Sequence, residues 1–135
     1  TTGAYITPNG SGTTTNSIKL DWVSGKITYS ATITTQADAS RDCAFASVTC
    51  ASSVSAAAQA VLKALALLPA SATASEYEDD HMWMNNGADE RAFSSGGSWN
   101  YGAIAGLFAL NGDGPRPGSG WHIGFRSAYV ALPTE

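Results

Sequence analysis

Alternating apolar and polar residues predict a β-hairpin in the first quarter of the chain. Apolar side chains fall on every second position over 18–22 and again over 27–33, and the residues VSG at 23–25 separate the two runs. A period of two places one side of each strand in a core, and a short run containing Ser and Gly suits the turn between them. The segment CAFASVTC at 43–50 is expected to form a third strand.

The apolar spacing changes to that of a helix after this segment. We expect an Ala-rich helix over about 53–68, with Ser53 as its N-cap and Pro69 ending it. Apolar residues recur on one side of this helix, so that side is expected to pack into the core. They are Val54, Ala58, Val61, Leu62, Leu65 and Leu68. Strands combined with one long helix predict an α+β fold.

Acidic residues are concentrated in the next segment. The stretch SATASEYEDDHMWMNNGADER at 71–91 contains six of the eleven acidic residues of the chain. Because acidic side chains favour the N-terminus of a helix, SEYEDD is expected to begin a second, short helix over about 75–82.

The same segment raises the question of a metal site. His81 follows Asp79 and Asp80, but adjacent residues point in different directions on any regular element, so we expect a solvated acidic turn and no transition metal. Calcium is left open as an alternative, because it prefers oxygen ligands, although no calcium-loop spacing is present. Its ligands would be backbone carbonyls with Asn85, Asn86, Asp89 or Glu90.

The bulk composition limits the size of the fold and the kind of partner. A chain of 135 residues is expected to form one domain, with a polar N-terminal arm or linker at 1–16 and a single domain at 17–135. The net charge is −4 and basic residues are not clustered, which argues against nucleic-acid binding and membrane insertion. Because the chain begins with Thr, we expect a processed protein or, as the favoured alternative, the C-terminal part of a longer one.

Two cysteines leave two interpretations open. Cys43 and Cys50 are seven positions apart, about 23 Å in a continuous strand, whereas a disulfide needs Cα atoms within about 7 Å. Two buried or half-buried thiols are therefore favoured, and a disulfide across a turn in AFASVT is the alternative.

Two glycine-rich aromatic blocks flank a polar loop in the last third of the chain. The blocks are SGGSWNYGAIAGLF at 95–108 and HIGFRSA at 122–128, and NGDGPRPGSGW at 111–121 lies between them. A loop of this length without secondary structure is uncommon in a compact domain and is usually functional. The blocks are therefore interpreted as a framework that holds a loop.

The spacing of GGSW, AGLFAL and GFRSA resembles the C-type-lectin-like domains of phage tail fibres and tropism determinants, the variable proteins of diversity-generating retroelements. That fold is shared with formylglycine-generating enzymes. The resemblance covers 94–131 and implies a C-type-lectin-like fold of antiparallel strands with the long helix. It also implies a framework made of Gly96, Gly97, Trp99, Gly106, Phe108, Gly124, Phe125 and Arg126.

The resemblance further implies that residues between the framework positions form a ligand-binding surface. Aromatic residues such as Tyr and Trp suit this role, because they offer a large contact area at low entropy cost. The candidate ligand-binding residues are Asn100, Tyr101, Ala103, Ile104, Asn111, Asp113, Arg116, Ser119, Trp121 and His122.

An enzymatic function is not expected. The thiol chemistry of the formylglycine-generating relatives needs cysteines late in the chain, and none follows Cys50. His81 and His122 are the only histidines, and neither lies near a Gly-x-Ser-x-Gly motif. A carboxylate pair could be drawn from 76–90, but a solvated surface has the same composition.

The resemblance implies a receptor-binding domain at a virion tail-fibre tip, recognising a host surface protein or glycan, as a homotrimer. The alternative is a structural virion component, such as a decoration or fibre-capping domain without a host ligand. A receptor-binding tip would expose the aromatic candidates on one face, whereas a structural component would bury them against another subunit. The residues that discriminate are Tyr101, Ile104, Trp121 and His122.

Overall fold

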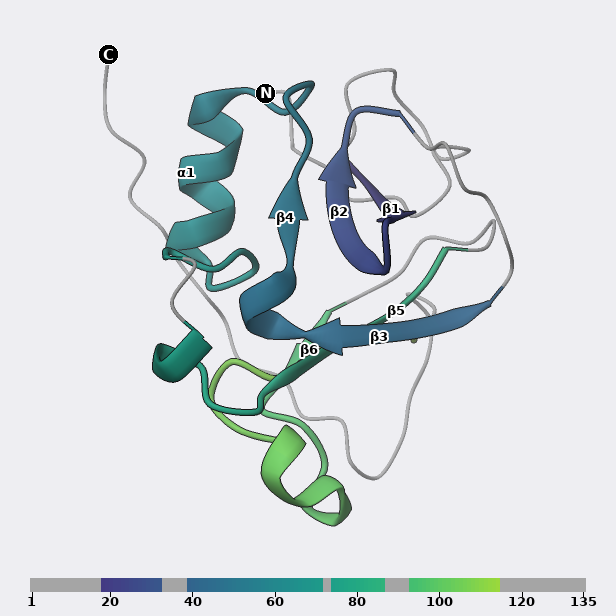
Figure 1. Cartoon of the computed structure of the whole chain (residues 1–135), viewed down its shortest axis with the longest axis vertical. Coiled ribbons are helices and arrows are strands. Elements are labelled where there is room, and N and C mark those ends of the chain that lie inside the picture. The colour runs from purple at the N-terminus through teal and green to yellow at the C-terminus, as the bar shows by residue number, and fades with distance from the viewer. Residues whose placement is uncertain (1–17, 33–38, 72–73, 87–92, 115–135) are drawn as a thin grey trace.

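The computed structural model describes residues 18–32, 39–71, 74–86 and 93–114 (Figure 1). Within these residues the chain forms two β-sheets, one α-helix and short 3-10 turns, which confirms the expected α+β class. The predicted arm over 1–16 and everything after residue 114 lie outside the described residues. No helix in the described ranges is long and apolar enough to cross a bilayer.

The first sheet contains the predicted hairpin. Its strands are β1 (Lys19–Val23), β2 (Lys26–Ser30) and β4 (Thr49–Cys50), in the order β1-β2-β4. Strands β1 and β2 are antiparallel, and the turn between them uses Ser24 and Gly25 with φ of 51° and 77°. Two successive residues at positive φ give the tight turn whose twist matches that of a hairpin. The hairpin prediction is confirmed.

The second sheet has the order β3-β5-β7-β6 and crosses below the first in Figure 1. Its strands are β3 (Ser40–Ala44), β5 (His81–Asn85), β7 (Leu110–Gly112) and β6 (Ser94–Ser95). Strands β5 and β7 are parallel, as are β2 and β4 in the first sheet. The expectation of antiparallel strands is thus wrong for these pairs. The long connection between β5 and β7 allows the chain to return and run in the same direction.

Residues 43–50 divide between the two sheets and do not form the predicted single strand. Strand β3 ends, the 3-10 turn η1 (Phe45–Ser47) follows, and β4 begins in the other sheet. The Phe45 side chain is fully buried. The chain therefore turns into the core at this residue, which ends the pairing of β3 and carries the backbone across to β2.

Helix α1 (Ala56–Ala64) begins later than predicted. Ser55 is the N-cap, and its Oγ accepts a hydrogen bond from the backbone N–H of Ala58 (3.2 Å). Ser53, the predicted cap, instead accepts a hydrogen bond from the backbone N–H of Ala31 (3.1 Å). Ser53 is therefore engaged with the loop after β2, and Ser55 caps the helix in its place.

The helix also ends earlier than predicted, before Pro69 is reached. Ala66 has a φ of 54°, and the backbone N–H of Leu67 donates to the carbonyl of Leu62 (2.9 Å), a pattern that closes the C-terminus of a helix. Leu65 lies beyond the helix and is 39% exposed. Three other residues of the predicted apolar side are buried, as expected: Val54, Leu62 and Leu68.

The second helix predicted over 75–82 is not formed. The 3-10 turn η2 (Ala74–Glu76) occupies its start, and strand β5 occupies its end. Glu78 has a φ of 47°, which interrupts any helix at this point. Met82 and Met84 are fully buried, whereas His81, Trp83 and Asn85 are half-buried. This is the alternation of a strand with one side in the core.

Tyr29 connects the first sheet to the segment that follows the helix. Its side chain is fully buried, and its hydroxyl donates a hydrogen bond to the carbonyl of Leu67 (2.8 Å). Burial raises the pKa of Tyr29 far above that of an exposed tyrosine, so the hydroxyl stays protonated and keeps donating. This bond fixes the turn after α1 against β2.

We expect Tyr29→Phe to lower the free energy of unfolding by about 1–2 kcal/mol, because the partly buried carbonyl of Leu67 loses its donor. Urea unfolding followed by circular dichroism measures the change. Tyr101→Phe is the matched control, since Tyr101 is 43% exposed, and it should leave stability unchanged. Equal midpoints for the Tyr29 variant and the unmodified chain would contradict the structural role of this bond.

Candidate functional site

A buried carboxylate organises the region between the two sheets. Asp80, directly before β5, is 6% exposed. Its Oδ2 accepts a hydrogen bond from the backbone N–H of Phe108 (2.8 Å), and its own carbonyl accepts one from Phe45 (2.7 Å). The expected solvated turn is correct for Glu78 and Asp79, which are exposed, and wrong for Asp80.

Three aromatic rings pack around this carboxylate's partners. Phe45 and Phe108 stack with centroids 5.8 Å apart, and the Tyr77 ring meets both edge-on, at 5.2 Å and 5.0 Å. Phe45 and Tyr77 are buried and Phe108 is half-buried, and contacts between such rings stabilise beyond the area they bury. Together with Asp80, they fix the position of Phe108, and hence the end of the SGGSWNYGAIAGLF segment.

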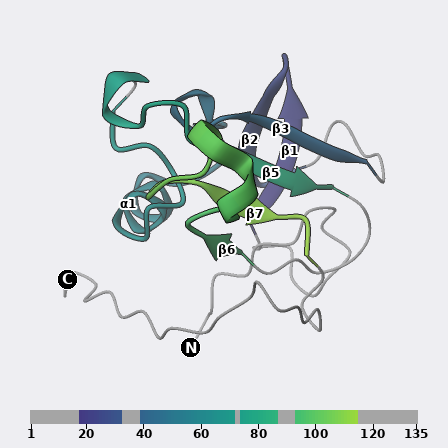
Figure 2. The same cartoon turned by 90° about the horizontal axis from the view of Figure 1, so that it is seen from below.

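The segment 96–109 closes on itself. The backbone N–H of Gly96 donates to the carbonyl of Ala109 (2.9 Å). Gly97 has a φ of 66°, and a Cβ at this position would lie 2.5 Å from the Cβ of Ala105, so only glycine permits the approach. The closed segment carries η3 (Trp99–Ile104), two short 3-10 turns separated at Gly102, whose φ of 60° is not helical. It lies over β5 and β7 in Figure 2.

An aromatic row forms where η3 meets β5. The ring of Tyr101 stacks on that of Trp83, with centroids 5.1 Å apart and planes at 26°, and the centroid of the His81 ring lies 5.8 Å from that of Trp83, with the planes tilted by 42°. His81 and Trp83 alternate with the buried methionines of β5, so they point away from the core. We call His81, Trp83 and Tyr101 the aromatic face.

Polar side chains adjoin the aromatic face. Asp42 on β3 and Asn111 on β7 are the register partners of Trp83 on either side, so all three share one side of the sheet. An Oδ2 of Asp42 lies 3.1 Å from Nδ1 of His81. The face thus combines stacked rings with a carboxylate, an imidazole and an amide, a combination able both to contact apolar surface and to form hydrogen bonds.

The structure brings several predicted ligand-binding residues to this region. Tyr101 stands on the aromatic face, next to the exposed Asn100 and Ala103, while Ile104 is half-buried. The side chain of Asn111 accepts a hydrogen bond from the backbone N–H of Asp113 (2.8 Å), which shapes the turn after β7. Four predicted residues lie outside the described ranges: Arg116, Ser119, Trp121 and His122.

The candidate residues missed from the sequence are Asp42, His81 and Trp83. In the segment HMWMN the two methionines lie on one side of the strand, and His81, Trp83 and Asn85 lie on the other. The expectation of a helix over 75–82 concealed this alternation. Read as a strand, its period of two would have placed His81 and Trp83 together. Nothing in the sequence indicated that Asp42 pairs with this strand.

One framework expectation is wrong. Trp99 is 84% exposed, so its indole is not part of a buried framework. The backbone N–H of Tyr101 donates to the carbonyl of Ser98 (2.9 Å), so Trp99 lies inside this turn with its side chain in solvent. The neighbouring Leu107 is likewise exposed, at 81%. Three further predicted framework residues lie outside the described ranges: Gly124, Phe125 and Arg126.

The cysteines are free thiols in different sheets. Cys43 is on β3 and Cys50 is on β4, and both are partly buried, so the favoured interpretation is confirmed and the disulfide is wrong. Burial is the largest cause that raises the pKa of each thiol. Little thiolate forms near neutral pH, which makes both cysteines poor nucleophiles.

The calcium alternative is only partly covered by the structure. Asn85 is half-buried and Asn86 fully buried, whereas Asp89 and Glu90 lie outside the described residues. Among the residues that the structure describes, no group of three or more His, Cys, Asp or Glu side chains could hold a metal ion.

No protein-family model matches the chain, and no curated protein matches it.

We expect Gly106→Ala to lower the free energy of unfolding by about 1–3 kcal/mol. A Cβ at this position would lie 2.3 Å from Oδ1 of Asp80, and this carboxylate cannot retreat without losing its bond to Phe108. Urea unfolding measures the effect. Gly114→Ala is the matched control, because a Cβ there has nothing within 4 Å, and its stability should stay within about 0.5 kcal/mol. Equal effects of both substitutions would contradict the close approach at Asp80.

We expect both cysteines to react slowly with iodoacetamide at pH 8. Their raised pKa values leave a smaller thiolate fraction than in glutathione, and the rate should keep rising at pH values where glutathione has already levelled off. Mass spectrometry of labelled peptides measures each rate. In denaturing urea both cysteines should react as glutathione does. A folded-state rate equal to that of glutathione would show that burial does not suppress the thiolate.

Proposed function

We propose that this chain is the receptor-binding domain of a virion, at the tip of a tail fibre, and that it recognises a host cell-surface protein or glycan. The observation that carries the proposal is the stacking of Tyr101 on Trp83 at a surface where Trp99 is 84% exposed. Exposed aromatic residues grouped on one side of a domain are typical of a binding surface.

The rigidity of η3 favours binding at this surface. The segment 96–109 is closed by the Gly96 to Ala109 hydrogen bond and fixed to the core by Asp80, so its aromatic residues are ordered before any ligand arrives. Contacts to a preorganised surface lose little conformational entropy. We further propose a homotrimer, in which several moderate contacts act together and raise the overall affinity.

We also propose that the domain has a C-type-lectin-like fold. The closed segment that contains GGSW, the mixed sheet beneath it and helix α1 support this assignment. In this arrangement the glycine-rich segment 96–109 exposes Trp99 and Tyr101 to solvent, and the β3-β5-β7-β6 sheet supports the segment from below.

The alternative is a structural virion component, such as a decoration or fibre-capping domain with no host ligand. The exposure of two large apolar side chains on the closed segment, Trp99 and Leu107, also suits contact with another subunit. In that case the aromatic face would be covered in the assembled particle and would contact no receptor.

We expect the labelled chain to bind selectively within a panel of bacterial strains, and Tyr101→Ala to weaken this binding about 30-fold or more, as loss of a central aromatic contact does. Flow cytometry of cells titrated with the labelled chain gives the apparent Kd. Because Tyr101 is 43% exposed, its substitution should leave the fold intact, which circular dichroism verifies.

Leu107→Ala is the control for this experiment, since Leu107 is 81% exposed and outside the aromatic row. Its apparent Kd should stay within about twofold of the unmodified chain. Equal loss of binding in Tyr101→Ala and Leu107→Ala would show that recognition does not depend specifically on the Trp83–Tyr101 stack. Absence of binding to every strain would favour the structural component.

A further inference from the structure

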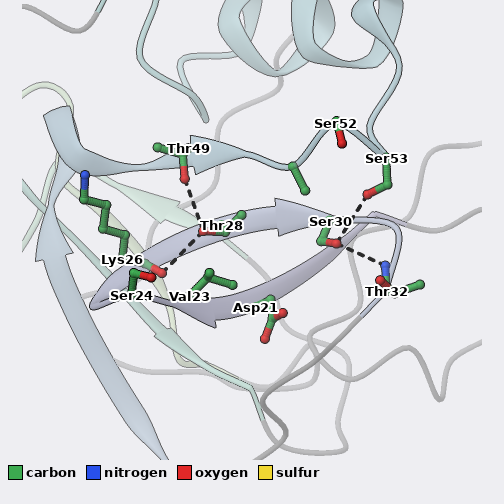
Figure 3. A pocket seen from close by; sticks show the side chains of 11 residues that line it. Asp21, Val23, Ser24, Lys26, Thr28, Ser30, Thr32, Thr49, Ser52 and Ser53 are labelled. Atoms are coloured by element: carbon green, nitrogen blue, oxygen red, sulfur yellow. Dashed lines mark hydrogen bonds between the residues drawn. The ribbon is translucent and has the colours of Figure 1, made fainter.

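A groove lies on the first sheet, away from the aromatic face. It has a cavity volume of about 570 Å³, within the range of roughly 300–1,000 Å³ typical of small-molecule sites. Figure 3 shows side chains from β1, β2 and β4, together with Ser52 and Ser53, arranged around it. Thr28, Ser30 and Asp21 are buried, and Thr49, Ser52 and Ser53 are exposed at its edge.

Hydroxyl groups dominate the lining. Oγ1 of Thr28 lies 3.1 Å from Oγ1 of Thr49, and Oγ of Ser30 lies 3.4 Å from Oγ of Ser53. Each pair connects a residue of β2 with a residue from the 49–53 segment, so the hydroxyls of the two segments face one another. Oγ of Ser30 also accepts a hydrogen bond from the backbone N–H of Thr32 (3.2 Å), and Oγ of Ser53 accepts one from that of Ala31 (3.1 Å). Since a hydroxyl has one donor and two acceptor positions, each of these two oxygens has one position left for a further hydrogen bond. The lining can therefore both donate to and accept from a ligand.

The charges in the groove favour a neutral ligand. One carboxylate, Asp21, and one ammonium group, Lys26, line it, so their formal charges cancel. Asp21 is 1% exposed and its Oδ1 accepts a hydrogen bond from the backbone N–H of Trp22 (2.9 Å), so its carboxylate is little accessible to a cation. The lining as a whole has no net charge that would select an ion. The lining contains no aromatic ring, and Val23 and Ala51 are its only residues with wholly apolar side chains.

From the volume, the hydroxyl lining and the balanced charge, we infer that this groove is a binding site for a neutral saccharide of one or two rings. Sugar hydroxyls also donate and accept at once, so they complement a lining of serine and threonine. The inference is independent of the proposed function, because the groove belongs to the β1-β2-β4 sheet and the aromatic face to the other sheet.

The test is a titration of the whole ¹⁵N-labelled chain followed by NMR. The probes are glucose, galactose, mannose, N-acetylglucosamine and lactose, each raised to about 100 mM, which detects binding far weaker than a Kd of about 1 mM. Inorganic phosphate is titrated in parallel as an anionic probe. At least one sugar is expected to shift the amide signals of 26–32 and 49–53, the segments that line the groove.

The double variant Thr49→Val and Ser52→Ala removes two hydroxyls from the exposed edge without changing the core. It should weaken the binding of that sugar about tenfold or more, since each hydrogen bond contributes about a fivefold change in affinity. Ser40→Ala combined with Ser75→Ala is the matched control, because both serines are exposed and outside the groove. The control should bind as the unmodified chain does.

Three results would overturn the inference. They are the absence of shifts with all five sugars, shifts confined to residues outside the groove, and shifts of the groove amides by phosphate alone. Equal affinity of the double variant and the unmodified chain would likewise reject the hydroxyl lining as the binding site. None of these results bears on binding through Tyr101, which is measured separately on cells.

Discussion

The hydrogen bond from the backbone N–H of Phe108 to the buried carboxylate of Asp80 fixes how the glycine-rich segment sits on the sheet. A buried carboxylate is costly unless it accepts hydrogen bonds, so the backbone around it must supply donors. Gly106 allows the chain to approach because a Cβ would overlap this carboxylate. The backbone carbonyl of Asp80 also accepts a hydrogen bond from the backbone N–H of Phe45. Asp80 therefore connects the end of β3, the start of β5 and the segment before β7.

The position of η3 follows from this constraint. With Phe108 packed against the rings of Phe45 and Tyr77, and Gly96 bonded to Ala109, the residues between Gly96 and Phe108 extend over the second sheet (Figure 2). Tyr101 is thereby placed on Trp83, two residues that are 18 positions apart in the chain. The position of the Tyr101 ring thus depends on the buried contacts of Asp80 and Phe108, which fix the ends of the segment that carries it.

The two sheets expose different kinds of side chain. The second sheet presents rings, with Asp42 and Asn111 beside them, whereas the first presents hydroxyls around a groove with one acidic and one basic residue. The core between them is continuous and includes residues of both sheets, among them Tyr29 and Met82. One packed core thus supports two surfaces of different character.

The sequence by itself determined the hairpin, the apolar side of the helix, the α+β class and the grouping of Tyr101 with glycine-rich neighbours, because periodicity and turn residues act locally. Tertiary contacts decided the rest. Ser55 became the cap because Ser53 bonds to Ala31, and residues 81–85 became a strand because β3 and β7 offered backbone partners on both sides. A buried Asp80 and its distant donor at Phe108 leave no local pattern, since the two are 28 positions apart and meet only after the chain has folded.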